Sequence, residues 1–112
     1  MISRERFDRQ SLPMRVGSIA ADLQRIASFS RHFENRPAVD TMIQEARFFI
    51  EWTAPYTDNR TQEDLAACQR VLTRWRRALD QVWADERHRS LICETAQEWA
   101  NVLLQDSGML EE

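Results

Sequence analysis

The sequence predicts an all-α protein in which four amphipathic helices form a four-helix bundle, most simply with an up-down-up-down antiparallel topology. Three observations predict this fold. First, the 112 residues include only two glycines and three prolines, so long segments contain no helix breaker. Second, apolar residues recur in those segments at steps of three and four, which is the spacing of one helical face. Third, the length suits one domain with its own core, and we expect residues 1–112 to form a single helical domain.

The N-terminal residues 1–10 are predicted to form a loose arm that docks through Phe7, because most of their other side chains are charged or polar. The first helix is predicted over residues 12–33. Ser11 can cap its free backbone amides, and Pro13 is tolerated in a first helical turn. The apolar stripe of this helix consists of Leu12, Val16, Ile19, Leu23, Ile26 and Phe33, with Ser30 at the one polar position.

The second helix is predicted over residues 37–52. Its start is expected near Arg36, because the residue before a proline avoids helical dihedral angles. The apolar stripe consists of Val39, Ile43, Ala46 and Ile50, and Met42 and Phe49 widen it. Residues 53–60 are predicted to form a loop, since Pro55 and the adjacent Asp58 and Asn59 interrupt the periodicity.

The third and fourth helices are predicted over residues 61–84 and 90–105, with Thr61 as the N-cap of the third. No glycine or proline separates them, so one continuous helix that extends into a dimer is the alternative. Such a helix would be about 68 Å long, which exceeds the diameter of a compact domain of this size. We therefore expect a tight break within residues 85–90. The two apolar stripes consist of Leu65, Cys68, Leu72, Trp75, Leu79 and Val82, and of Ile92, Ala96, Trp99 and Leu103.

The charge balance and the termini restrict the location and the partners. The formal net charge is −3, and all fifteen basic residues are arginine. A negative chain is not attracted as a whole to nucleic acid or to an anionic membrane, so we expect neither as a partner. The N-terminus lacks an apolar signal segment, and no stretch approaches the roughly 18 apolar residues that span a bilayer. These features predict a cytoplasmic protein of a bacterial-type cell. Cys68 and Cys93 are predicted to stay unpaired, because a helical hairpin would separate them by about 18 Å along its axis.

The segment from Arg70 to Trp83 mixes arginine and tryptophan, as a platform for single-stranded nucleic acid does. At about 100° per residue, however, Trp75 and Trp83 lie on the apolar face of the third helix, and most of the arginines lie on the opposite side. The tryptophans are therefore expected in the core. Arg70, Arg74 and Arg77 are expected to form an outward basic ridge, and binding of nucleic acid or of an acidic partner through this ridge is the second functional hypothesis.

Motifs of catalysis are missing from the sequence. It contains no P-loop, nucleophile elbow, Cys-x-x-Cys or dinucleotide-binding motif. Asp85 and His88 have the spacing of half a bundle metal site, but a second such unit is missing. Glu94 and Glu98 form one carboxylate pair, whereas magnesium-dependent helical hydrolases gather several. We therefore expect no enzymatic activity, no cofactor and no metal. A metal-dependent helical-bundle hydrolase is the third hypothesis.

The second helix carries two aromatic residues outside its apolar stripe. With Val39 as the origin, the stripe centres near 340°, but Phe48 lies at about 180° and Trp52 at about 220°. Either these side chains pack within the monomer, under the loop or under the arm with Phe7, or they contact a partner. The leading hypothesis is a noncatalytic protein-interaction or scaffold module that binds another protein, or a second copy of itself as a homodimer. Its interface is predicted to include Arg47, Phe48, Trp52 and Tyr56.

Overall fold

The computed structural model describes residues 2–108, and this part of the chain is helical without any strand. The all-α prediction is therefore confirmed for the described residues. The predicted domain of residues 1–112 also includes residue 1 and residues 109–112, which lie outside them. Five α-helices and two short 3-10 helices follow one another as α1 (Arg4–Asp8), α2 (Leu12–Phe29), η1 (Phe33–Asn35), α3 (Arg36–Thr53), η2 (Ala54–Tyr56), α4 (Asn59–Val82) and α5 (Glu86–Ser107).

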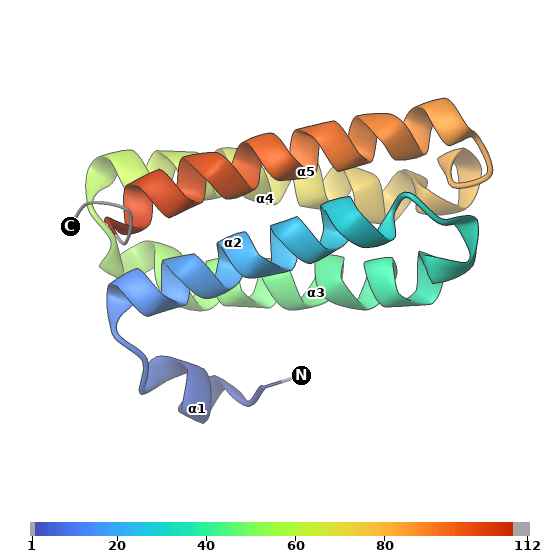
Figure 1. The fold of residues 1–112 in the computed structure, drawn as a ribbon. Coiled ribbons are helices and arrows are strands. Elements are labelled where there is room, and N and C mark those ends of the chain that lie inside the picture. Colours follow the sequence, from blue (N-terminus) through green and yellow to red (C-terminus); the bar gives the residue numbers. More distant parts are fainter. Residues whose placement is uncertain (1, 109–112) are drawn as a thin grey trace.

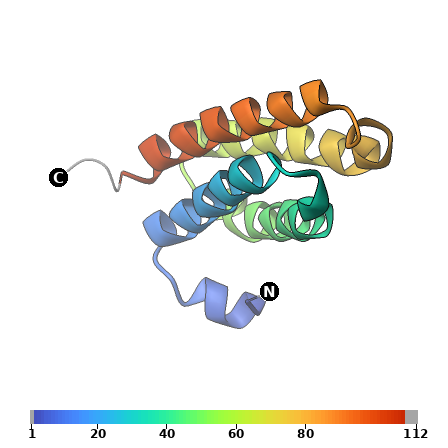
Figure 2. The same ribbon diagram turned by 45° about the vertical axis from the view of Figure 1, so that its right-hand side comes forward.

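The four long helices lie side by side, and α1 lies apart from them at one edge (Figures 1 and 2). Each long helix packs against the next one in the chain, and α5 packs against α2. The contacts of α2 with α5 and with α3 are the most extensive, and those between α4 and α5 are the sparsest of the four. The molecule measures 38 × 27 × 22 Å along its principal axes. No helix of the described part is long and apolar enough to cross a membrane.

The core lies where the apolar stripes of the long helices meet, and the predicted stripes are confirmed at most of their positions. Trp75 and Trp99 are half-buried and pack against this core from its edge. The buried residues that were predicted are Val16, Ile19, Leu23, Ile26, Val39, Ile43, Ala46, Ile50, Leu65, Cys68, Leu72, Leu79, Ile92, Ala96 and Leu103.

The predicted end of the first helix is wrong. α2 ends at Phe29, and Ser30 caps it through a backbone N–H that donates to the carbonyl of Ile26 at 3.0 Å. The chain then turns, and Phe33 is 58% exposed instead of buried. A contact from a distant part of the chain accompanies this turn, because the indole Nε1 of Trp83 donates to the carbonyl of Phe33 at 2.6 Å. Periodicity extends the apolar stripe to Phe33, but it contains no information about this hydrogen bond.

α3 begins at Arg36, within one residue of the predicted start, but the expectation that Arg36 avoids helical angles is wrong. Arg36 is helical (φ −52°, ψ −46°) and is the first residue of α3, although Pro37 follows it. Pro37 falls within the first helical turn, where the missing N–H leaves no hydrogen bond unmade. The 3-10 turn of η1 leads directly into this helix, which overrides the bias against helical angles before proline.

Aspartates cap the two C-terminal helices. The carboxylate of Asp58 accepts the N–H of Thr61 at 2.8 Å, so Asp58 and not Thr61 is the N-cap of α4, which begins at Asn59. Thr61 is instead buried. A break between the last two helices is present as predicted, but it covers residues 83–85 instead of 85–90, since α4 ends at Val82 and α5 begins at Glu86. α5 begins four residues earlier than predicted, because Asp85 accepts the N–H of Arg87 at 2.9 Å and caps it.

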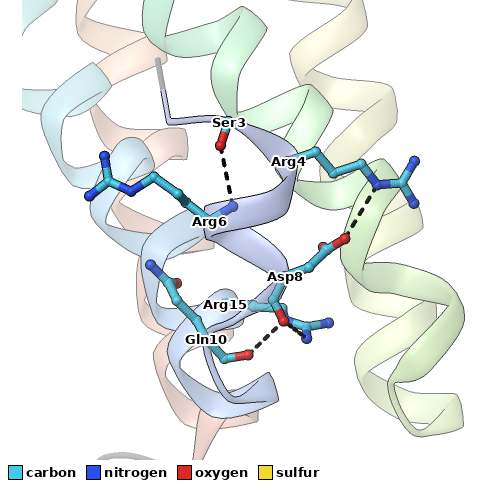
Figure 3. Close-up of polar contacts among 6 residues, drawn as sticks. All are labelled: Ser3, Arg4, Arg6, Asp8, Gln10 and Arg15. Carbon is cyan, nitrogen blue, oxygen red and sulfur yellow. Dashed lines mark hydrogen bonds and ion pairs between the residues drawn. The ribbon is translucent and has the colours of Figure 1, made fainter.

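The N-terminal arm is not loose. Residues 4–8 form α1, in which the hydroxyl of Ser3 accepts the N–H of Arg6 at 3.2 Å and Arg4 pairs with Asp8 at 3.5 Å (Figure 3). Arg15 of α2 donates to the carbonyls of Asp8 at 2.5 Å and of Gln10 at 2.9 Å. Phe7 is fully buried, which confirms the predicted docking. Charged residues predict exposure, but one buried phenylalanine and one arginine from the next helix hold this segment in place.

Candidate functional site

Aromatic rings join α1 to α3. The ring of Phe7 stacks on the ring of Phe49, with centroids 4.1 Å apart and planes inclined by 13°. Trp52 lies 5.7 Å from Phe7 and 5.8 Å from Phe49, and its ring is tilted against both. Phe49 and Trp52 are three residues apart on α3, so they project from the same side of that helix. This cluster holds Trp52 in one place, although its side chain is only half-buried.

Phe48 lies outside this cluster and contacts it from the solvent side. Its ring stacks on Trp52 with the centroids 5.9 Å apart and the planes inclined by 23°. The guanidinium of Arg4 lies 5.8 Å from the centre of the Trp52 ring. Phe48 is half-buried, and unlike Trp52 it does not pack against the core. Packing within the monomer thus applies to Trp52, which contacts the core. Contact with a partner stays open for Phe48, which extends the aromatic contact toward solvent. We call Phe48 and Trp52 the aromatic face.

Arg47 links the aromatic face to α4. Its guanidinium Nη1 donates to the amide oxygen of Gln44 at 3.1 Å, and its Nε is buried without a hydrogen-bond partner. The carbonyl of Arg47 accepts a hydrogen bond from Nε2 of Gln69 at 3.0 Å. Gln69 precedes Arg70 in α4, so the backbone of Arg47 lies beside the start of the predicted basic ridge. Arg47 is therefore held within the monomer by one side-chain and one backbone hydrogen bond.

The basic ridge of Arg70, Arg74 and Arg77 is exposed along α4, as predicted. The tryptophans of the same helix face inward, since Trp75 is half-buried against the core and Trp83 is buried. A depression of about 490 Å³ lies beside the ridge, lined by Gln69, Arg70, Thr73 and Arg74. The separation of arginine from tryptophan that the helical period predicts is thus present in the fold.

Tyr56 does not belong to the aromatic face. It is 62% exposed and belongs to η2, where it lines a cavity of about 130 Å³ with residues of α2, α4 and α5. We call this cavity the end cavity, because it lies where α2 and α4 begin and α5 ends, at the left of Figure 1. Its lining residues are Leu12, Pro13, Val16, Tyr56, Thr57, Asp58, Thr61, Asp106 and Ser107. Tyr56, which was predicted to share one interface with Phe48 and Trp52, therefore belongs to a different surface site.

Two carboxylates, those of Asp58 and Asp106, line the end cavity, and Asp64 contacts Asp106; the sequence did not predict this group. The side chain of Asp106 is only 5% exposed, and Arg60 Nε lies 3.9 Å from its Oδ1. Burial, followed by the hydrogen bond and charge of Asp64, raises the pKa of Asp106 to about 6. Asp58 adds a further negative charge nearby. No spacing rule relates these positions, because α5 meets the start of α4 only in the folded chain.

A second buried carboxyl group lies between α2 and α3. Asp22 is fully buried, and its Oδ1 accepts a hydrogen bond from Arg25 Nη2 at 2.6 Å. The pKa of Asp22 is raised to about 7, chiefly by burial; the hydrogen bond and charge of Arg25 oppose this shift, and those of Glu45 add to it. A signal for Asp22 was present in the sequence, since it lies about 60° from Ile19 on the helical wheel, at the margin of the apolar stripe.

The residues considered for a metal site do not gather. His88 contacts Asp85 at 2.9 Å, and both are exposed, as are Glu94 and Glu98. Within residues 2–108, no three or more of the histidine, cysteine, aspartate and glutamate side chains are grouped to hold a metal ion. Cys68 and Cys93 are unpaired; Cys68 is buried, which raises the pKa of its thiol to about 12, and Cys93 is half-buried.

The chain was compared with protein-family models, with curated proteins and with solved structures, and none of them matches it. Its function must therefore be inferred from its own surfaces.

Proposed function

We propose that the protein is a small noncatalytic interaction or scaffold module that binds an acidic protein surface through the aromatic face and the basic ridge. The observation that carries this proposal is the stacked pair of Phe48 and Trp52, in which Phe48 extends outward beyond the core. Aromatic and arginine side chains dominate the centres of protein interfaces, and this pair lies beside Arg47.

The aromatic face has the rigidity that favours binding. Trp52 contacts both Phe7 and Phe49, so its rotamer is restrained before any partner arrives. Ordering a flexible side chain at an interface costs roughly 0.5–1.5 kcal/mol, and a restrained side chain avoids most of that cost. The docked α1 thus supports the proposed interface through Phe7, and its exposed Arg4 lies over the Trp52 ring.

The charges beside this face indicate the chemistry of the partner. Arg70, Arg74 and Arg77 are exposed on α4, in a chain whose net charge is −3. Arginine pairs with carboxylates through two parallel hydrogen bonds, so an acidic protein surface complements the ridge. We expect the partner to present an apolar side chain flanked by aspartate or glutamate.

A second copy of the chain offers a surface of this kind. Leu91 and Val102 are exposed on α5, and Glu94 and Glu98 are exposed between them. Their spacing places all four on one side of that helix. A contact between this side of one copy and the aromatic face of another would be heterologous, so it would build rings or chains of copies as well as pairs.

We also infer that the four long helices form an up-down-up-down antiparallel four-helix bundle, which serves as the rigid base of the interface. Consecutive long helices are neighbours in space, and their connections are short. Short connections favour antiparallel neighbours.

Photo-crosslinking in cells that contain the native partners tests the interface. A crosslinking residue replaces Glu51, which is exposed on α3 close to Phe48, and a control replaces Gln24, which is exposed on α2. We expect one dominant adduct from position 51, loss of that adduct in the Phe48→Ser background, and no such adduct from position 24. The identified partner should then bind the purified protein less tightly as salt rises. An adduct that persists in Phe48→Ser, or that forms equally from position 24, would contradict the proposed face.

Solution mass tests the second copy as partner. Sedimentation of the wild type over a range of concentrations is compared with Phe48→Ser and with the double variant Arg70→Glu, Arg74→Glu. Phe33→Ser is the matched aromatic control, because Phe33 is exposed on another part of the surface. Association that weakens in Phe48→Ser and in the double variant, but not in Phe33→Ser, would support self-assembly. A wild type that is monomeric at every concentration would exclude it.

Nucleic-acid binding through the basic ridge is the second candidate function. The exposed row of Arg70, Arg74 and Arg77 favours it. The inward position of Trp75 and Trp83 weighs against stacking of bases on this surface, and stacking normally accompanies the arginines in single-strand binders. Retardation of DNA or RNA that falls steeply with salt and disappears in the double variant would support this candidate.

A further inference from the structure

We propose that the side of the bundle formed by α4 and α5 binds the same side of a second copy of the chain, in a closed two-fold homodimer. This side lies away from α1, whose Phe7 contacts the aromatic face (Figure 1). The proposal does not rest on the aromatic face. It pairs α4 of one copy with α5 of the other, whereas the heterologous contact pairs α5 with the aromatic face.

α4 and α5 each carry a second row of residues beside the core stripe. Asp64 of α4 contacts Asp106 of α5, so these two residues mark the sides on which the helices face each other. Steps of three and four from the two aspartates define the rows. We call them the α4–α5 face, and all of their members are half-buried or exposed: Ala67, Val71, Trp75, Ala78 and Val82 on α4, and Leu91, Thr95, Trp99 and Val102 on α5.

The α4–α5 face leaves apolar surface open to solvent. Of the five large hydrophobic side chains that are exposed within residues 2–108, two belong to it, with Leu91 58% and Val102 38% exposed. Val102 also lines a depression of about 490 Å³ to which Arg60 contributes from the start of α4. Contacts between α4 and α5 are the sparsest among neighbouring long helices. Apolar surface gathered on one side of a molecule is typical of an interface.

The size of the face suits a dimer. With 24 and 22 residues, α4 and α5 are about 36 and 33 Å long at 1.5 Å per residue. Two packed helices are together about 20 Å wide, so the face covers roughly 700 Å². A standard interface buries about 800 Å² on each partner. Only a partner that covers both helices along most of their length approaches this class, and a second α4–α5 face does so.

The register of such a dimer is determined by its symmetry. α4 and α5 run in opposite directions, since residues 83–85 join the end of one to the start of the other and Asp64 meets Asp106 at the far end. A residue that follows Asp64 by some number of places is therefore level with the residue that precedes Asp106 by the same number. Rotation about an axis parallel to the helices keeps these levels and places α4 of one copy opposite α5 of the other.

In this register the large side chains meet small ones. Leu91 precedes Asp106 by fifteen places and Ala78 follows Asp64 by fourteen, so they differ in level by about 1.5 Å between the two copies. Val102 and Ala67, at four and three places, differ by the same amount. Each exposed hydrophobic side chain of one copy thus lies opposite an alanine of the other, which is the arrangement that lets helices pack closely.

The charges at the edges of the face select the same axis. Arg74 is level, within about 3 Å, with Glu94 and with Glu98 of the other copy's α5. All three side chains are exposed, and none forms an ion pair within the described part of the chain. Arginine pairs strongly with carboxylates. An axis across the middle of the helices would instead bring Arg74 of both copies together, and likewise Glu98, so like charges oppose that arrangement.

Sedimentation equilibrium of the full chain tests the dimer, with circular dichroism as the check of folding. We expect the wild type to form a dimer and nothing larger, because a two-fold contact closes. Leu91→Ser, at an exposed position, should raise the dissociation constant at least about tenfold. Met14→Ser, which removes an exposed hydrophobic side chain of α2, and Phe48→Ser should leave it unchanged. A wild type that is monomeric at about 1 mM, that assembles beyond a dimer, or that responds to Phe48→Ser but not to Leu91→Ser would overturn the proposal.

Two charge-reversed variants test the two-fold axis. Arg74→Glu places like charges at both symmetric contacts, and so does the double variant Glu94→Arg, Glu98→Arg. Each should dimerise at least about tenfold more weakly than the wild type. An equimolar mixture of the two should form a heterodimer with nearly the wild-type affinity, because opposite charges then meet at both contacts. A mixture that associates no better than its components, or variants that dimerise like the wild type, would contradict the pairing of α4 with α5.

Discussion

Within residues 2–108, two pairs of neighbouring carboxyl groups differ in their access to solvent, and we call one the closed pair and the other the open pair. Asp22 and Glu45 lie between α2 and α3, where Asp22 is fully buried and held by Arg25. Asp64 and Asp106 lie between α4 and α5, and Asp106 lines a cavity. Burial is the main cause of the raised pKa in both pairs, but the shift is larger for Asp22. The difference indicates that a cavity at the surface moderates the cost of a buried charge, because water or a cation can enter it.

The closed pair lies one helical turn beyond two points where the N-terminal segment contacts α2 and α3. Ser18, whose hydroxyl donates to Gln10 at 3.1 Å, precedes Asp22 by four residues on α2. Phe49, which stacks on Phe7, follows Glu45 by four residues on α3. Residues four apart are neighbours on one side of a helix, so the carboxyl pair lies on the same sides of α2 and α3 as these two contacts. The docking of α1 should therefore influence how far water reaches Asp22.

Phe7→Ala should have the largest effect, since it opens the closed side. Loss of a buried phenylalanine costs about 3–5 kcal/mol in the free energy of unfolding, and we expect about 3 kcal/mol because α1 can detach without unfolding the rest. Urea unfolding measures this change. Detachment should also lower the pKa of Asp22 toward its usual range, which carboxyl carbon NMR can follow. Phe33→Ala, at an exposed site, should change stability by less than about 0.5 kcal/mol. An unchanged Asp22 pKa in Phe7→Ala would refute the proposed influence of α1 on Asp22.

Asp22→Asn should have the second largest effect, and its sign depends on pH. The folded protein keeps a proton on Asp22 up to about pH 7, whereas the unfolded chain releases it near pH 4. The stability of the wild type therefore falls as the pH rises from about 4 to about 7. Asparagine does not titrate, so the variant should be more stable than the wild type at pH 8 by on the order of 2 kcal/mol, and by little at pH 4. Thermal unfolding across this range measures the difference, with exposed Asp40→Asn as the control. A variant less stable than the wild type at pH 8 would mean that the Arg25 contact outweighs the cost of burial.

Asp106→Asn should also raise the free energy of unfolding at pH 8, and its effect should be the smallest of the three variants. The stability of the wild type should depend on the titration of Asp106 between about pH 4 and pH 6, because the pKa of Asp106 is raised to about 6 in the folded state. The stability of the wild type should fall as the pH rises through this window. We expect the variant to be more stable at pH 8 by on the order of 1 kcal/mol, since the cavity admits solvent. The same unfolding series measures it, and a gain larger than that of Asp22→Asn would reverse the comparison between the open and closed pairs.

The helical faces followed from the sequence because they depend on local periodicity. Leu72 and Leu79 are buried and Arg70 and Arg74 are exposed, as their positions on one helix require. The break before α5 was also predictable, since one continuous helix would be longer than the whole domain. The position of the break was not predictable, because several polar residues of this segment could cap α5, and the structure uses Asp85.

Helix ends and the N-terminal arm depended on contacts between distant residues. Phe33 lies in phase with the stripe of α2, yet it is exposed, and Trp83 from the end of α4 holds its carbonyl. Arg15 similarly holds the end of α1 by donating to two carbonyls. Such hydrogen bonds require that the helices have already packed, so no pattern within one segment predicts them.

For the candidate sites, the sequence by itself determined that Phe48 and Trp52 lie off the apolar stripe and that Arg70, Arg74 and Arg77 point outward. These are properties of single helices, and the period of about 3.6 residues decides them. Only the tertiary structure decided that Phe7 supports Trp52 and that Tyr56 joins a different cavity. It alone also brought Asp106 to Asp64, because desolvation and Coulomb energy depend on distances in space and not on separation along the chain.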